Sequence, residues 1–159
     1  FPIHSVLERA AIKKGYTSYK AAHPIVFKNI MNPDAQPLLA TVAPTYQIGL
    51  ASAGERGIIQ QMLLETALEP YFETVVSGAE IAHNKPAPDV YLEALKRMHL
   101  EPTEAVAIED SALGIQAGKA AGLTVIALKP FDPLFAIDQS AADYQIESLK
   151  EVPAILATL

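Results

Sequence analysis

Short apolar runs alternate with stretches of helical periodicity from about residue 44 to the end of the chain. A short apolar run that ends in small or polar residues is typical of a strand buried in a parallel sheet. Strands that alternate with helices predict an α/β protein. We therefore expect strands at residues 46–52, 74–78, 105–108 and 123–128, and a weaker strand near residues 144–146.

The segments between these runs predict helices. A segment of small residues predicts a helix that ends at Ala121, and Gly122 follows it where a left-handed C-terminal cap is expected. A closing helix is predicted over residues 149–156. Two further helices have four apolar residues each at helical spacing: Ile58, Met62, Leu63 and Leu64 over residues 57–68, and Val90, Leu92, Leu95 and Met98 after Asp89.

The first 40 residues have a different pattern. Residues 2–14 and 18–30 predict two helices with no strand between them, and residues 35–41 predict a short helix that leads into the first strand. We interpret residues 1–32 as a helical appendage and residues 33–159 as an α/β core. The alternative is that the first two helices are packing helices of the core itself.

Composition and charge limit the classes of function. Half of the 159 residues are apolar and 19% are charged, which is typical of a globular chain. The net charge of −6 argues against nucleic-acid binding, which needs a cluster of lysine and arginine. The chain has no cysteine, no apolar run long enough to span a membrane and no signal-peptide pattern. These features predict a cytoplasmic protein that binds neither membrane nor nucleic acid.

Polar residues lie at or after the ends of several predicted strands, at the sheet edge where open α/β proteins bind ligands. They are Ser52, Lys85, Glu109, Asp110 and Ser111. Each has a simple structural interpretation: either serine, or Asp110, can cap a turn or a helix, and Lys85 can be a solvated residue before a helix. Together they are a hydroxyl, a lysine and a carboxylate pair. That set suits a phosphate and Mg²⁺, because Mg²⁺ prefers oxygen ligands and a lysine neutralises phosphoryl oxygens.

The order of these motifs along the chain resembles the haloacid dehalogenase superfamily, in particular its β-phosphoglucomutase and phosphoglycolate phosphatase branch. The resemblance covers about residues 33–130. It implies a Rossmann-like, three-layer parallel sheet with part of a helical cap at the N-terminus. The motifs that carry it are Ile48-Gly49-Leu50-Ala51-Ser52, Val76-Ser77-Gly78, Lys85-Pro86-Ala87-Pro88-Asp89, Ile108-Glu109-Asp110-Ser111 with Gly114-Ile115, and Ala120-Ala121-Gly122.

The resemblance also implies roles for individual residues. Ser52 and Ala53 would bind the phosphoryl group, and Lys85 would hold the phosphate and screen the nucleophile. Asp110 would be a direct Mg²⁺ ligand, with Glu109 orienting metal-bound water. The carboxylate pair favours phosphoryl transfer over dehalogenation.

Two further residues near the expected site have two possible roles each. Arg56 could reach a substrate phosphate, but a surface arginine on a helix is an equally good interpretation. Ser111 is the other candidate, with helix capping as its alternative.

The sequence departs from the family pattern in one respect. The family reaction uses an aspartate nucleophile in an Asp-x-Asp motif after the first, central strand, and this sequence contains no Asp-x-Asp. The sheet is therefore expected to be incomplete for lack of that strand, between the strands that end near Ser52 and Asp110. Three arrangements would explain this: a fragment of a longer protein, which we favour, a strand donated by another chain, or direct pairing of the two flanking strands.

These features predict a Mg²⁺-dependent phosphatase or phosphomutase for a small phosphorylated metabolite such as a sugar phosphate. Its nucleophile would lie outside this chain, so that the full-length protein is an enzyme and this chain alone is inactive. The alternative is a non-catalytic phosphate-binding or interaction module. A flavodoxin-like receiver domain fits less well, because it needs an acidic cluster at the first strand.

Overall fold

The computed structural model describes residues 25–130 and 137–159. The chain divides into two compact units, with the boundary between Ile30 and Met31. In the first unit the described residues include one short helix, α2 (Phe27–Ile30). The helix predicted over residues 2–14, and most of the one predicted over residues 18–30, fall outside the described residues.

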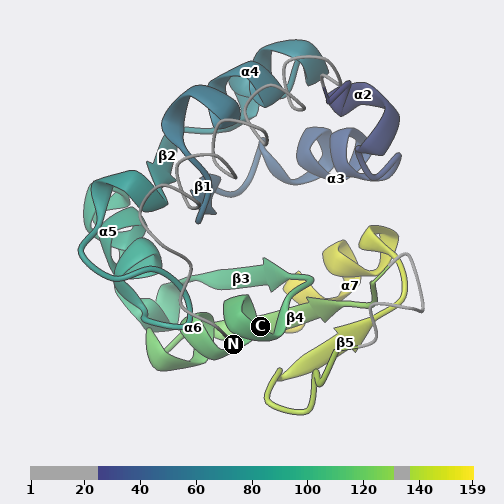
Figure 1. Cartoon of the computed structure of the whole chain (residues 1–159). Helices are drawn as coiled ribbons and strands as arrows, with labels where there is room; N and C mark the ends of the chain where they lie inside the picture. Colours follow the sequence, from purple (N-terminus) through teal and green to yellow (C-terminus); the bar gives the residue numbers. More distant parts are fainter. Residues whose placement is uncertain (1–24, 131–136) are drawn as a thin grey trace, which may run out of the picture. The chain divides into compact units, whose positions relative to one another are not determined.

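The second unit alternates helices with strands, which confirms the predicted α/β class (Figure 1). Each predicted strand is present, with its ends shifted by up to three residues. The helices and strands are α3 (Ala35–Val42), β1 (Gly49–Ser52), α4 (Arg56–Thr66), β2 (Thr74–Ser77), α5 (Asp89–Met98), β3 (Val106–Glu109), α6 (Ala112–Ala120), β4 (Thr124–Leu128), β5 (Tyr144–Ile146) and α7 (Val152–Leu156), with 3-10 turns at Glu69–Tyr71, Gly78–Glu80, Pro102–Glu104 and Leu149–Glu151.

All pairings between the described strands are parallel, and they form two separate sheets. Strand β1 pairs with β2 in one sheet, and the other sheet has the order β3-β4-β5. Strands β1 and β3 do not pair with each other. The structure therefore contradicts direct pairing of the strands that end near Ser52 and Asp110, and it shows the incomplete parallel sheet that the sequence predicts.

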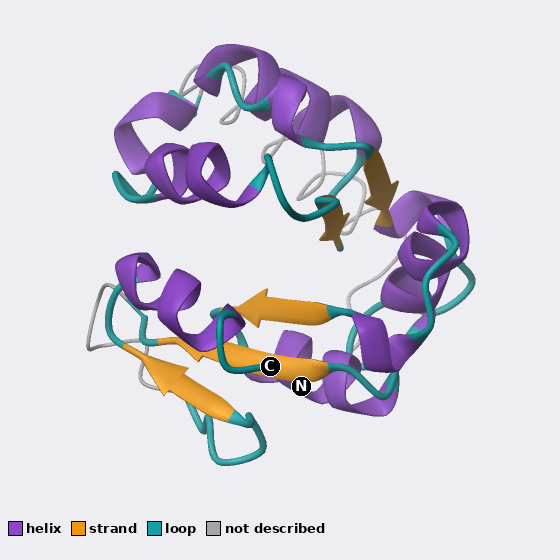
Figure 2. Cartoon of the chain, turned by 180° about the vertical axis from the view of Figure 1, so that it is seen from behind, coloured by secondary structure: helices purple, strands orange, loops and turns teal. Residues whose placement is uncertain are grey.

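Helices cover both faces of the β3-β4-β5 sheet (Figure 2). Successive residues of β4 point to opposite faces, so that Val125 and Ala127 join one core and Ile126 joins another. The first core includes residues of α5 and α6, and the second includes residues of α3 and α7. A third cluster, built on Ile59 and Leu63 of α4, packs beside the β1-β2 pair.

The apolar faces of α4 and α5 differ in part from the prediction. In α5, Tyr91 and Ala94 are buried together with Val90 and Leu95, whereas Leu92 is exposed. In α4, the buried residues are Ile59, Leu63 and Thr66, whereas Ile58 and Leu64 are exposed. In each case the buried residues follow the three- and four-residue spacing of one helix face, and the exposed ones lie outside it.

Gly122 has a φ of +82°, which confirms the left-handed position predicted after α6.

Strand β3 is buried on one face only. Ala107 and Glu109 point into the protein, and Ile108 between them is 41% exposed. No helix among the described residues is long and apolar enough to cross a membrane.

Candidate functional site

The predicted site residue Ser52 is the last residue of β1, and the predicted site residue Ser111 lies in the turn after β3. The Gly54 amide donates to Ser52 Oγ at 3.1 Å. The Gly114 amide donates to Ser111 Oγ at 3.0 Å, which makes Ser111 the N-cap of α6. Both serines thus have the turn or capping role that their sequence context allowed.

Lys85 connects the ends of β1 and β3. Its ammonium group donates to the carbonyl oxygen of Ala51 at 3.2 Å and forms an ion pair with Glu109. Ala51 and Glu109 lie at the carboxyl ends of their strands. Side-chain exposure is 11% for Lys85 and 9% for Glu109, so that the pair is largely removed from water. A single lysine therefore brings two of the predicted motifs together although they belong to separate sheets.

The Glu109 carboxylate is held by three donors. Its Oε1 accepts hydrogen bonds from Lys85 and from the Tyr91 hydroxyl, and its Oε2 accepts from Ser111 Oγ at 3.1 Å. The first turn of α6 lies against this carboxylate at Gly114, where a Cβ atom would overlap both oxygens. Gly114 therefore permits the close approach of α6 to Glu109, and any side chain there would displace the carboxylate.

Tyr91 is the member of this cluster that the sequence analysis missed. Its side chain lies in the core face of α5, and burial, with the negative charge of Glu109 and then Asp110, raises its pKa strongly. The hydroxyl therefore stays protonated and donates to Glu109. The available signal was its position one residue after Val90 on the apolar face of α5, because a buried tyrosine hydroxyl needs a polar partner.

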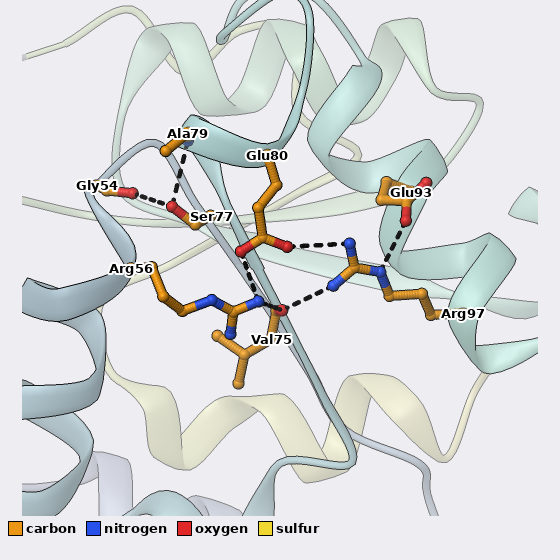
Figure 3. Close-up of polar contacts among 8 residues, drawn as sticks. All are labelled: Gly54, Arg56, Val75, Ser77, Ala79, Glu80, Glu93 and Arg97. Atoms are coloured by element: carbon orange, nitrogen blue, oxygen red, sulfur yellow. Dashed lines mark hydrogen bonds and ion pairs between the residues drawn. The ribbon is translucent and has the colours of Figure 1, made fainter.

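A second charged cluster lies beside β2 (Figure 3). Glu80 forms ion pairs with Arg56 at 2.5 Å and with Arg97 at 3.0 Å. Both guanidinium groups also donate to the carbonyl oxygen of Val75, at 3.0 and 3.1 Å, and Arg97 pairs with Glu93 as well. The Arg56 side chain is therefore engaged by Glu80 and Val75, in the way expected of a structural surface arginine.

Glu80 should make the stability of the fold sensitive to acid. Burial opposes its charge, but hydrogen bonds and charges of Arg97 and Arg56 outweigh this and lower its pKa below the ordinary value of 4.5. A carboxylate with a lowered pKa stabilises the fold above its ordinary pKa, and this contribution is lost as the pH falls through the folded-state value.

The free energy of unfolding should fall as the pH is lowered from about 6 to about 3.5, and we expect this fall to be smaller in Glu80→Gln than in the wild type. Urea denaturation at the two pH values measures that loss. Glu73→Gln, at an exposed side chain, is the control and should keep the full wild-type loss. Equal losses for wild type and Glu80→Gln would show that the cluster has no such role.

The turns after β1 and β2 are joined by buried Ser77. Its Oγ donates to the Gly54 carbonyl oxygen at 2.7 Å and accepts from the Ala79 amide at 3.2 Å (Figure 3). The next residue, Gly78, lies so close to Ala53 that a Cβ atom would be 2.5 Å from the Ala53 carbonyl oxygen. These contacts fix the backbone of the predicted phosphate-binding turn.

Asp110 follows directly after β3, and its side chain is exposed. It makes no hydrogen bond or ion pair within the part of the chain that the structure describes. No group of three or more histidine, aspartate or glutamate side chains among these residues could hold a metal ion. The chemistry of Asp110 fits a single oxygen ligand of Mg²⁺, since Mg²⁺ in such sites is bound by one or two carboxylates plus phosphate oxygens and water.

The fold and the site define an α/β protein whose charged side chains gather at the carboxyl ends of parallel strands. The family model for haloacid dehalogenase-like hydrolases matches residues 5–128. The chain belongs to that family, and the resemblance in its motifs is confirmed.

Individual relatives agree with this. The chain is 38% identical over 106 residues to the protein CbbY of Rhodobacter capsulatus, covering 65% of this chain and 46% of that protein. It is 37% identical over 79 residues to the fructose-1-phosphate phosphatase YqaB of Escherichia coli, covering 50% of this chain and 42% of that protein. The chain thus spans less than half the length of these two relatives.

Solved structures of the family share the fold. A phosphatase from Thermococcus onnurineus superposes with a TM-score of 0.71 at 29% identity, covering 79% of this chain and 58% of that one. A β-phosphoglucomutase from Clostridium difficile superposes with a TM-score of 0.75 over 96% of this chain and 67% of that one. At 22% identity, the second likeness concerns the fold alone.

Proposed function

We propose that this chain forms the phosphate-binding and magnesium-binding part of a phosphatase or phosphomutase that acts on a small phosphorylated metabolite, such as a sugar phosphate. The observation that carries the proposal is the position of Lys85, which links the carboxyl ends of β1 and β3. Relatives named as a fructose-1-phosphate phosphatase, a hexitol phosphatase and a β-phosphoglucomutase support the substrate class.

In this proposal the turn after β1 and Lys85 bind the phosphoryl group. The Ser52 hydroxyl and the Ala53 amide would donate hydrogen bonds to its oxygens, in a turn held by Ser77. Lys85 would neutralise charge that develops on the phosphoryl group during transfer. Arg56, which is engaged by Glu80, would support this turn from α4.

The residues after β3 would serve the metal. Asp110 would be a direct ligand, and Mg²⁺ would supply positive charge against the phosphoryl oxygens. Glu109 would not bind the metal directly, because its oxygens already accept hydrogen bonds from Lys85, Tyr91 and Ser111. Its role would be to orient groups near the metal and to keep Lys85 in place.

The proposal places the nucleophile, an aspartate, outside this chain. Strands β1 and β3 have no partner on their facing sides among the described residues. We propose that a strand from elsewhere in a longer protein, or from another chain, fills that place and brings the aspartate with it. We retain the division into a cap portion, residues 1–32, and a core, residues 33–159, as part of this proposal.

A second candidate is a non-catalytic module that binds phosphate through the same residues. It would be the function if the full-length protein, like the given sequence, contained no Asp-x-Asp motif. The two candidates predict the same binding residues and differ in turnover.

Phosphate release from fructose 1-phosphate and β-glucose 1-phosphate, measured with and without Mg²⁺, tests the proposal. We expect release by the full-length protein that depends on Mg²⁺, and none by this chain alone. Asp110→Asn should lower the rate at least about 100-fold, whereas the control Asp138→Asn should leave it unchanged. Full activity of Asp110→Asn would contradict the metal assignment. No release by the full-length protein would favour the binding module.

A further inference from the structure

The Tyr91 hydroxyl joins both members of the buried Lys85–Glu109 ion pair. It donates to Glu109 Oε1, and its oxygen lies 3.2 Å from Lys85 Nζ. The same Nζ lies 4.8 Å from the centroid of the Tyr91 ring. One side chain therefore contacts the ammonium group with both its hydroxyl and its aromatic face.

The hydrogen bonds of Lys85 can be counted completely. A lysine ammonium has three N–H donors. The structure gives them three acceptors: the Ala51 carbonyl oxygen, the Tyr91 hydroxyl and Glu109 Oε1. Tyr91 can accept from Lys85 because its own proton goes to Glu109. The three acceptors come from β1, α5 and β3, and together they determine the direction of the ammonium group.

Tyr91 is the acceptor best suited to fix that direction. Lys85 lies in the loop before α5 and has a long, flexible side chain. Tyr91 is 8% exposed, packs in the core that includes Val76 and Val125, and has only two side-chain rotations. A phenylalanine would fill the same space without a polar group to bury. Burying the hydroxyl of Tyr91 is therefore unfavourable by itself, and its contacts with Lys85 and Glu109 are what offset this cost.

We propose that Tyr91 is a positioning residue: its hydroxyl orients the Lys85 ammonium group between the ends of β1 and β3, where the phosphoryl group would bind. The purpose of this orientation rests on the proposed function. The orientation itself does not, because the three contacts of Lys85 exist without a ligand.

Tyr91→Phe tests the proposal, because it removes the hydroxyl and keeps the ring. The first measurement is the ¹H–¹⁵N signal of the Lys85 ammonium group without ligand. We expect a resolved signal in the wild type, with a nuclear Overhauser contact to Tyr91, and a shifted or broadened signal in Tyr91→Phe. The control is Tyr46→Phe, at a tyrosine that is 44% exposed, and it should leave the Lys85 signal unchanged.

The second measurement is the affinity for inorganic phosphate, followed on the same signal. We expect Tyr91→Phe to bind phosphate about three- to tenfold more weakly than the wild type and Tyr46→Phe. An unchanged Lys85 signal, or equal phosphate affinity in Tyr91→Phe, would overturn the proposal.

Two other outcomes are also informative. If the wild-type signal does not respond to phosphate, the proposed function fails, and the ligand-free signal alone decides the role of Tyr91. If Tyr91→Phe does not fold, the wild-type Overhauser contact decides: its presence supports the proposal, and its absence contradicts it.

Discussion

Lys85→Met is expected to lower the free energy of unfolding by about 3–5 kcal/mol. The substitution keeps most of the volume of the side chain but leaves Glu109, which is 9% exposed, with a buried charge and no cation. A buried charge that has lost its partner is costly, because the ion pair no longer offsets the removal of that charge from water. Urea denaturation of wild type and variant at neutral pH measures the difference.

The matched control removes the charge as well. Lys85→Met combined with Glu109→Gln leaves no buried ion, and the amide oxygen can still accept from Tyr91. We expect the double variant to regain at least about half of the lost stability. Lys129→Met, at an exposed ion pair with Glu147, should change the midpoint very little. If the double variant lost as much stability as Lys85→Met and Glu109→Gln lose when their separate losses are added, the result would contradict a buried ion pair.

Gly114→Ala is expected to destabilise the protein by about 2–3 kcal/mol. A methyl group at this position overlaps the Glu109 carboxylate, so that either α6 or the carboxylate must move. Movement of the carboxylate would also disturb Lys85, and we therefore expect weaker phosphate binding in the same variant.

Gly57→Ala is the matched control for this change. Gly57 also lies in a helix, α4, but a Cβ atom there would meet nothing within 4 Å. Because alanine is the better helix former, this variant should be more stable than the wild type by about 0.5–1 kcal/mol. Equal effects of the two glycine substitutions would show that α6 does not depend on close contact with Glu109.

Local features of the fold could be predicted from the sequence because they depend on neighbouring residues. The apolar runs around β1 and β4, the glycine after α6 and the serine that caps α6 all act within a few positions. The exposure of Leu92 could not be predicted in the same way, since α5 presents Tyr91 and Ala94 to the core instead. That choice of helix face depends on where β2, β3 and α6 lie.

Candidate residues for the site could be proposed from the sequence, but their contacts could not. Ser52, Lys85 and Asp110 are candidates because they lie at or after the ends of predicted strands and match the motifs of the family. The contact of Lys85 with Ala51 joins residues 34 positions apart, and its contact with Glu109 spans 24 positions. Such contacts arise from the folded arrangement, so that the sequence could suggest a polar partner for a buried Tyr91 but could not identify Lys85 and Glu109 as its partners.

We propose that the ends of β1 and β3 form one site for phosphate and Mg²⁺. Calorimetric titration of this chain with inorganic phosphate, with and without Mg²⁺, tests it most directly. We expect Mg²⁺ to strengthen phosphate binding at least about fivefold. Asp110→Asn should abolish that enhancement without weakening the binding seen in the absence of Mg²⁺, whereas Asp138→Asn should behave as the wild type. Phosphate binding that is indifferent to Mg²⁺, or an enhancement that survives in Asp110→Asn, would contradict the claim.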